Sequence, residues 1–162
     1  MIQVSPDPLE RLDLSLAAML VGLALAEDVQ RRLAADGFAD ARFGHGFVFQ
    51  HLVAGPLPIG DLARAMDVTQ QRASKATAEL EALGYLRREP DPADARVRRI
   101  ALTERGQAVI EASRRARASI LDDLRARLGA ERVEAAEELL REVLRETGAD
   151  AAVSARRVRL PS

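Results

Sequence analysis

Apolar residues recur at intervals of three or four along most of the chain, which is the spacing of one face of an α-helix. Long stretches of this kind cover residues 9–33, 104–128 and 131–146. Gly37 follows the first stretch and Gly129 separates the other two, in positions where glycine commonly ends a helix. The pattern therefore predicts one long helix near the N-terminus and two near the C-terminus.

The middle of the chain predicts shorter elements. A short helix is expected over residues 45–53, and two more over 59–66 and 70–83, with a tight turn between them. Thr69 lies directly before the last of these helices and can cap it. The sequence thus predicts two short, consecutive helices joined by a turn.

A β-hairpin is expected directly after these helices. Residues 85–89 and 97–102 read as short strands, and the segment between them, with Pro90 and Pro92, reads as a rigid turn. Helix, turn, helix and hairpin in this order are the layout of a winged helix-turn-helix. We therefore expect one domain over residues 1–162, mainly α with a small β-hairpin wing.

Composition places the chain among folded, non-membrane proteins. Of its 162 residues, 48% are hydrophobic and 30% are charged, which is typical of a soluble globular domain. No apolar run reaches the roughly 20 residues of a membrane span, and the N-terminus lacks a signal-peptide pattern, so a cytoplasmic location is expected. Cysteine is absent, which excludes disulfides, thiolate metal sites and a thiol redox switch.

The net charge of −1 gives no general sign of a nucleic-acid-binding protein, so DNA binding must rest on local charge. Polar residues gather at the start of the helix predicted over 70–83, namely Thr69, Gln70, Gln71, Arg72, Ser74 and Lys75. We expect Gln71, Arg72 and Lys75 to read base edges in the major groove. Thr69 and Ser74 suit phosphate oxygens, contacts that position a protein without specifying sequence.

The predicted wing is rich in arginine. Arg96 lies at its tip, where a guanidinium could enter a narrow minor groove. Asp94 can pair with a neighbouring arginine and hold the turn. The strands carry Arg87, Arg88, Arg98 and Arg99, of which some should face DNA; the sequence does not sort them. A merely solvated hairpin is the alternative for this arginine run.

Residues 80–92 read Leu-Glu-Ala-Leu-Gly-Tyr-Leu-Arg-Arg-Glu-Pro-Asp-Pro, and residues 94–106 read Asp-Ala-Arg-Val-Arg-Arg-Ile-Ala-Leu-Thr-Glu-Arg-Gly. In its Asp-x-Arg turn and Leu-Thr-x-x-Gly exit, this run resembles the end of the recognition helix, the wing and the following helix of the MarR family. The resemblance is clearest over residues 59–106. It also implies that Arg96 contacts the minor groove and that Asp94 stabilises the turn.

The resemblance implies a transcription regulator, typically a repressor, that binds a pseudo-palindromic operator in double-stranded DNA as a homodimer. It implies a DNA-binding lobe at 45–103 and dimerisation helices at 9–35 and 104–147. The remaining residues, 148–162, are rich in alanine and arginine and have no sustained apolar period, so a mobile tail is expected there. The apolar surface of the long helices favours a dimer independently, although they could instead pack only within the chain. No cofactor and no metal are expected.

Many proteins of this kind are released from DNA by small aromatic or phenolic ligands. The region that the resemblance assigns to such a ligand here contains Phe43, His45, Phe47 and Phe49, facing the first helix. The alternative is that the phenylalanines fill a corner of the core and that the histidine is a cap or a surface residue.

Two other functional classes are weighed against a DNA-binding regulator. The sequence offers few residues or motifs for an enzyme active site, because it has no cysteine, a single tyrosine, no phosphate-binding glycine loop and no serine elbow. A winged helix that binds a protein in place of DNA is the second alternative. It predicts an apolar outer face on the helix at 70–83, whereas the residues there are polar and basic.

Overall fold

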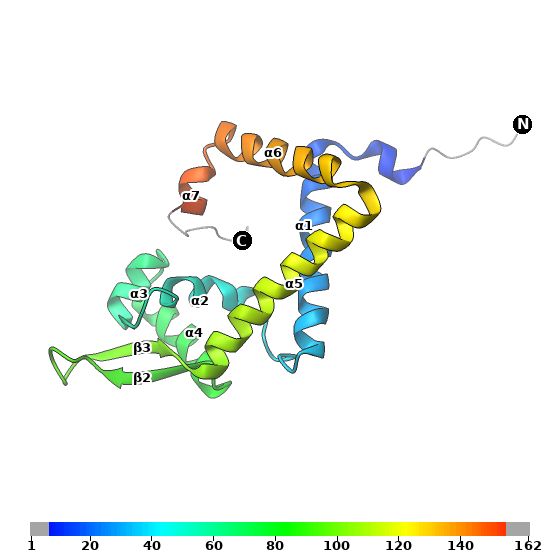
Figure 1. The fold of residues 1–162 in the computed structure, drawn as a ribbon. Coiled ribbons are helices and arrows are strands. Elements are labelled where there is room, and N and C mark those ends of the chain that lie inside the picture. Colours follow the sequence, from blue (N-terminus) through cyan, green and yellow to red (C-terminus); the bar gives the residue numbers. More distant parts are fainter. Residues whose placement is uncertain (1–6, 155–162) are drawn as a thin grey trace, which may run out of the picture.

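The computed structural model describes residues 7–154, and its long helices form a frame to which a smaller lobe is attached (Figure 1). Helix α1 (Leu14–Ala35) packs against α5 (Glu104–Leu128), and α6 (Ala130–Glu146) continues from the end of α5 remote from the lobe. The sheet and the short helices lie around the start of α5 (Figure 1). The mainly helical fold with a small wing, predicted from the residue pattern, is confirmed.

The first helix is shorter than the apolar pattern over residues 9–33 predicts. A 3₁₀ turn, η1 (Pro8–Arg11), comes first, and α1 begins only at Leu14. Asp13 precedes it with an extended backbone, and its carboxylate accepts the N–H of Leu16 at 2.9 Å. This N-cap sets the start of the helix, and the apolar spacing alone could not locate it.

The lobe contains the two consecutive helices that the sequence predicts. Its elements before the wing are η2 (Phe43–His45), α2 (Gly46–Leu52), β1 (Leu57–Pro58), α3 (Ile59–Ala65) and α4 (Gln70–Ala82). Thr69 caps α4, since its side-chain oxygen accepts the N–H of Arg72 at 3.2 Å. The turn between α3 and α4 contains Asp67 in the left-handed region, with a φ of 53°.

The wing is the larger part of a three-stranded antiparallel sheet in the order β1-β3-β2. Strands β2 (Leu86–Pro90) and β3 (Arg98–Leu102) form the predicted hairpin, with Arg88 opposite Ile100. Strand β1 adds Leu57 on the other side of Ile100. The sequence did not predict β1, because a two-residue strand that includes a proline has no alternating pattern to recognise.

The wing is attached to α5 by a tight junction. Thr103 accepts the N–H of Gly106 at 3.0 Å, which caps α5, and it donates its hydroxyl to the carbonyl of Gly84 at 2.6 Å. A Cβ on Gly106 would lie 2.2 Å from the carbonyl oxygen of Tyr85, so only glycine fits there. The Thr-x-x-Gly exit of the wing is thus a packing requirement of the fold.

The core of the lobe lies between α2, α4, the sheet and α5. Its largest fully buried side chains are Tyr85, Leu62, Leu80, Ile100, Val109 and Thr77. The ring of Phe49 packs edge-on against the ring of Tyr85, with centroids 5.7 Å apart. This core fixes the position of α4 relative to the start of α5.

The C-terminal tail expected at 148–162 contains a short helix that the sequence did not predict. Helix α7 (Asp150–Ser154) follows α6 after a turn at Gly148, and the part of the tail from 155 to 162 lies outside the described residues. Across residues 7–154, every helix is too short or too polar to span a membrane.

Candidate nucleic-acid interface

Helix α4 is buried on one side and open to solvent on the other. Ala73, Thr77 and Leu80 form its buried side, at the spacing of one helical face. The exposed residues of its first two turns are Gln70, Gln71, Arg72 and Lys75. The structure therefore brings Gln70 and the three residues predicted to read bases, Gln71, Arg72 and Lys75, together on the outer face of α4.

The two residues predicted to contact phosphate also have roles within the fold. Thr69 accepts the N–H of Arg72 as the cap of α4, which leaves its hydroxyl hydrogen free to donate outward. Ser74 is half-buried, and its carbonyl accepts the hydroxyl of Thr77 at 3.1 Å. Thr69 is therefore placed more openly than Ser74 at the start of the outer face.

Backbone hydrogen bonds hold the turn at the tip of the wing. The carboxylate of Asp94 accepts the backbone N–H of Arg96 at 2.9 Å, and its carbonyl accepts the N–H of Val97 at the same distance. Asp94 thus contacts the backbone, whereas the carboxylate–arginine contact expected of it is made by Asp91, 3.7 Å from Arg99. The Arg96 side chain is exposed at the tip.

The structure sorts the wing arginines by their partners. Arg87 donates to the carbonyl of Leu102 and to Glu89, and Arg88 donates to Glu81 on α4 at 3.0 Å. Arg99 donates to the carbonyl of Pro56 at 2.9 Å, so it ties β3 to the segment before β1. By contrast, within the described part of the chain no carboxylate pairs with Arg96 or with Arg98.

A cluster around the buried Tyr85 joins the lobe to the long helices. Tyr85 follows the end of α4, and its hydroxyl donates at 2.5 Å to Asp40, which lies in the segment between α1 and α2. Arg105, in the first turn of α5, donates to the same carboxylate at 2.9 Å, and its guanidinium lies 4.8 Å from the centre of the Tyr85 ring. Three segments far apart in the sequence therefore meet at one side chain.

The electrostatics of this cluster favour the ionised carboxylate. The hydrogen bond from Tyr85 holds the pKa of Asp40 below its ordinary value, and the charge of Arg105 acts in the same direction. Burial raises the pKa of Tyr85, and its bond to Asp40 raises it further. Tyr85 is thus a neutral donor to a charged acceptor, an arrangement stronger than a bond between neutral groups.

The sequence pattern placed Tyr85 only at the start of a predicted strand and did not single out Asp40 or Arg105. Asp40 is 45 residues from Tyr85, and Arg105 is 65 residues from Asp40. Neither short-range spacing nor charge pattern connects positions so far apart. The one available signal was that Tyr85 is the only tyrosine, and a buried tyrosine usually has a hydrogen-bond partner.

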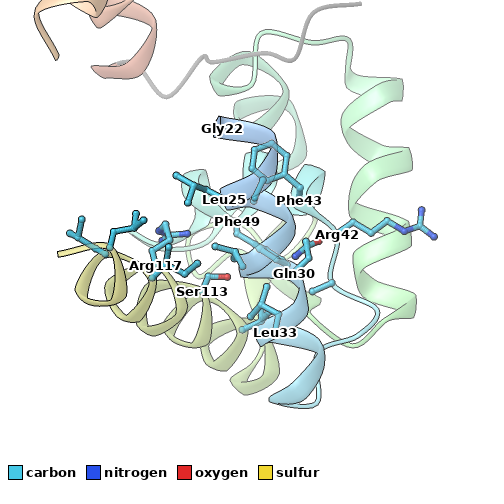
Figure 2. Close-up of a pocket in the computed structure, with 17 residues that line it drawn as sticks. Gly22, Leu25, Gln30, Leu33, Arg42, Phe43, Phe49, Ser113 and Arg117 are labelled. Carbon is cyan, nitrogen blue, oxygen red and sulfur yellow. The ribbon is translucent and has the colours of Figure 1, made fainter. Parts of the chain in front are cut away.

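An apolar cavity of about 510 Å³ lies between α1, the start of α2 and α5 (Figure 2). Its apolar walls come from residues such as Leu25, Val29, Phe49 and Leu121. Gln30, Ser113 and Arg117 also line it, and Figure 2 shows Ser113 and Arg117 on α5 across from Gln30 on α1. The cavity therefore combines a large apolar surface with a few polar groups, as sites for small molecules do.

The four residues predicted to bind a ligand are divided between the cavity and its surroundings. Phe43 and Phe49 line the cavity, whereas His45 and Phe47 do not. His45 is buried beside it and accepts the backbone N–H of Arg42 through Nδ1 at 3.1 Å. Phe47 packs edge-on against Phe43, with ring centroids 5.7 Å apart. Phe49 thus fits both alternatives, because it lines the cavity and is also buried in the core, whereas Phe43 is 52% exposed and lines only the cavity.

Apolar side chains are exposed at the end of the molecule remote from the wing. Residues 14–26 of α1 include no charged residue, and large side chains there are open to solvent, Leu23 to 60%. On α6, Leu139, Leu140 and Leu144 are 40 to 49% exposed. We call these two surfaces the apolar faces of α1 and α6.

The element order, the exposed polar face of α4 and the arginine-tipped hairpin define a winged helix-turn-helix protein. A family model described as the MarR family matches residues 46–97, which run from α2 to the tip of the wing. The winged helix of this chain is therefore similar to that of the MarR family, as the resemblance in the sequence predicts. Members of this family are transcription regulators.

Solved structures agree with the fold over nearly the whole chain. YusO from Bacillus subtilis is 20% identical with a TM-score of 0.65, and the match covers 87% of this chain and 98% of YusO. The transcriptional regulator Tm0710 from Thermotoga maritima is 25% identical with a TM-score of 0.58, covering 88% and 97%. A MepR variant from S. aureus, bound to an oligodeoxyribonucleotide, is 21% identical with a TM-score of 0.62, covering 85% and 99%. No curated protein sequence matches the chain.

Proposed function

We propose that the protein is a transcription regulator that binds a specific operator in double-stranded DNA, with α4 in the major groove and the wing along the adjacent backbone. The observation that carries this proposal is a set of unpaired cations. Arg72 and Lys75 on α4 and Arg96 and Arg98 on the wing are exposed, and no carboxylate among residues 7–154 pairs with them. Cations free of carboxylate partners are available to phosphates and to guanine.

The side chains on this surface divide into groups with different proposed roles. Gln71, Arg72 and Lys75 contact base edges, because they lie on the outer face of the first two turns of α4. Thr69 contacts phosphate through its hydroxyl, assisted by Gln70 and Ser74. Arg96 enters the minor groove, and Arg98 follows the backbone beside it. The wing turn stabilised by Asp94 holds both arginines outward.

The protein acts as a homodimer in this proposal. The apolar faces of α1 and α6 expose leucine, methionine and valine side chains that a single chain leaves in water. A two-fold pair that buried these faces would place two copies of α4 about one DNA turn apart, on a pseudo-palindromic operator. Such a regulator works in the cytoplasm, where it has access to chromosomal DNA.

Repression would be relieved by a small ligand in the cavity between α1, α2 and α5. A volume of about 510 Å³ lies within the range of pockets for small molecules. Phe43 and Phe49 supply aromatic surface, and Arg117 faces the same space without a carboxylate partner among the described residues. These groups suit an aromatic molecule with an acidic substituent, whose anion meets Arg117.

The DNA-binding proposal is tested by fluorescence anisotropy with duplexes from the region upstream of the gene, at several salt concentrations. We expect tight binding that weakens steeply as salt rises, since phosphate contacts release counterions. Lys75 is the only lysine in the sequence, so modification of a lysine side chain by an amine-reactive reagent, located by mass spectrometry, reports on α4. Operator DNA should protect Lys75.

Failure to bind any duplex at low salt would overturn the proposal and favour the protein-interaction alternative. Arg31→Ala provides a control, because Arg31 is an exposed arginine on α1 that pairs with Asp28. It should leave operator affinity unchanged. Ligand release is tested separately by adding benzoate or 1-naphthoate to the complex, with the uncharged amides as controls for the role of Arg117.

A further inference from the structure

Glu79 on α4 is held by two residues from the segment that forms the cavity wall. Its Oε1 atom lies 3.4 Å from Nη1 of Arg42 and 3.5 Å from Nε2 of His45. His45 is almost completely buried, whereas the side chains of Arg42 and Glu79 are 77% and 49% exposed. One carboxylate oxygen on α4 is therefore shared between Arg42, which directly precedes η2, and His45, the last residue of η2.

The hydrogen bonds of His45 determine which ring nitrogen faces Glu79 as a donor. The backbone N–H of Arg42 donates to Nδ1 at 3.1 Å, so Nδ1 is an acceptor. In the neutral ring the proton is then on Nε2, which faces the carboxylate of Glu79. The ring is also packed edge-on against Phe49, with centroids 6.4 Å apart. The His45 ring is thus oriented by Arg42, Glu79 and Phe49, and its Nε2–H donor points at α4.

The same short segment contacts the cavity on its other side. Arg42, Phe43, Gly46 and Phe49 all line the cavity. In Figure 2 the guanidinium of Arg42 extends away from the other lining residues, which agrees with its ion pair to Glu79. A molecule in the cavity would therefore press on residues whose opposite side holds α4.

Glu79 lies one helical turn beyond Lys75 on α4, so a movement of Glu79 shifts the residues proposed to read bases. We propose that Glu79, held by His45 and Arg42, is the positioning residue through which occupancy of the cavity changes the orientation of α4. This inference rests on the proposed function and adds the contacts that couple the ligand cavity to the DNA-binding face of α4. When η2 is displaced, the contacts to Glu79 change and operator affinity falls.

The test uses a double-mutant cycle that needs no ligand. Ala26 on α1 is half-buried and lines the cavity, so Ala26→Phe fills part of it. Operator affinity is measured for the wild type, Ala26→Phe, Glu79→Gln and the double variant. We expect Ala26→Phe to weaken operator binding at least about fivefold in the wild-type background, the size of a modest allosteric coupling. In the Glu79→Gln background the same change should alter affinity less than about twofold.

Glu81→Gln is the matched control for charge and position. Glu81 lies two residues further along α4 and pairs with Arg88 of the wing, away from the cavity. In its background, Ala26→Phe should keep its full effect. His45→Gln retains an amide donor in place of Nε2 and should preserve the response, whereas His45→Phe should abolish it. Circular dichroism melts verify that each variant is folded.

An equal effect of Ala26→Phe with and without Glu79 would overturn the inference, and would assign the coupling to the packed core around Phe49. A folded Ala26→Phe variant that binds operator with wild-type affinity in every background would overturn it as well. Failure of the proposed function can be distinguished from failure of this inference, because the wild-type protein would then bind no duplex at all.

Discussion

Two exposed surfaces of this chain differ sharply in chemistry, although both are formed by helices. The outer face of α4 presents Gln71, Arg72 and Lys75, whereas α6 presents leucines. Polar side chains that carry hydrogen-bond donors can bind base edges and phosphate oxygens. Both of these groups are hydrated until the protein contacts them. Apolar side chains match only another apolar surface. The difference indicates that each face is built for a different partner.

The two faces lie at opposite ends of α5, and each is fixed to it by different means. Near the wing, Thr103 and Gly106 join the sheet to α5, and Arg105 joins α5 to Tyr85 and Asp40. At the far end, α6 follows α5 after Gly129. A homodimer formed through the apolar faces would thus set the spacing of the two copies of α4 through rigid helices.

The largest effect should come from a charge on the apolar face. Leu140→Glu would bury an unpaired carboxylate in the proposed dimer, at a cost of several kcal/mol. We expect a monomer by sedimentation, and operator affinity at least about 100-fold weaker because only one half-site is bound. Glu142→Gln on the same helix should change neither. A Leu140→Glu variant that remains a dimer would show that α6 does not form the interface.

A smaller but still large effect is expected at the junction between the wing and α5. Gly106→Ala places a Cβ 2.2 Å from the carbonyl oxygen of Tyr85, which neither backbone can avoid without moving. The free energy of unfolding should fall by about 3 kcal/mol or more, measured by urea denaturation. Gly60→Ala, in α3, meets no atom within 4 Å and should be neutral or slightly stabilising. Similar stability of the two variants would contradict this account of the junction.

The sequence predicted the local parts of this structure well. It placed the second helix of the motif at 70–83, and the structure has α4 at Gln70–Ala82. It also identified the hairpin and the outward side chains of α4, because capping and helical periodicity act over a few residues. These features are encoded within one element each, so they can be read without knowing the fold.

Features that depend on contacts between distant segments could not be predicted. The pairing of β1 with β3, the contact of Arg99 with Pro56 and the Tyr85 cluster all join residues 20 or more positions apart. The sequence located only part of the candidate ligand site, again because the rest depends on contacts between distant segments. Phe43 and Phe49 line the cavity, but Gln30 and Arg117 come from helices that only the tertiary structure brings beside them.

The role of α4 is tested more narrowly by Arg72→Ala. A guanidinium that reads one base pair contributes about 1 to 3 kcal/mol of discrimination, so operator affinity should fall roughly tenfold or more. Selection of bound sequences should show relaxed preference at one position of each half-site. Arg88→Ala is the matched control, because Arg88 is already paired with Glu81. Equal losses for both variants would count against the distinction between paired and unpaired arginines.

The smallest expected effect concerns Asp40, and it depends on pH. The folded-state pKa of Asp40 lies below its unfolded value, so the ionised carboxylate stabilises the fold above the unfolded pKa of about 3.9. This contribution is lost as pH falls through the folded-state pKa. Asp40→Asn keeps an acceptor for Tyr85 but removes the charge beside Arg105. At pH 7 it should lower the free energy of unfolding by about 1 kcal/mol, since the pair is partly exposed to solvent.

Urea denaturation between pH 2 and pH 7 should therefore show the wild type and Asp40→Asn converging as the medium becomes acidic. Asp36→Asn is a suitable control, because Asp36 is an exposed carboxylate 3.7 Å from Arg115 and contacts no part of the Tyr85 cluster. Its curve should stay close to that of the wild type at every pH. A constant difference between wild type and Asp40→Asn would mean that the asparagine alters packing, and that the charge of Asp40 does not help to hold the winged-helix lobe on the long helices.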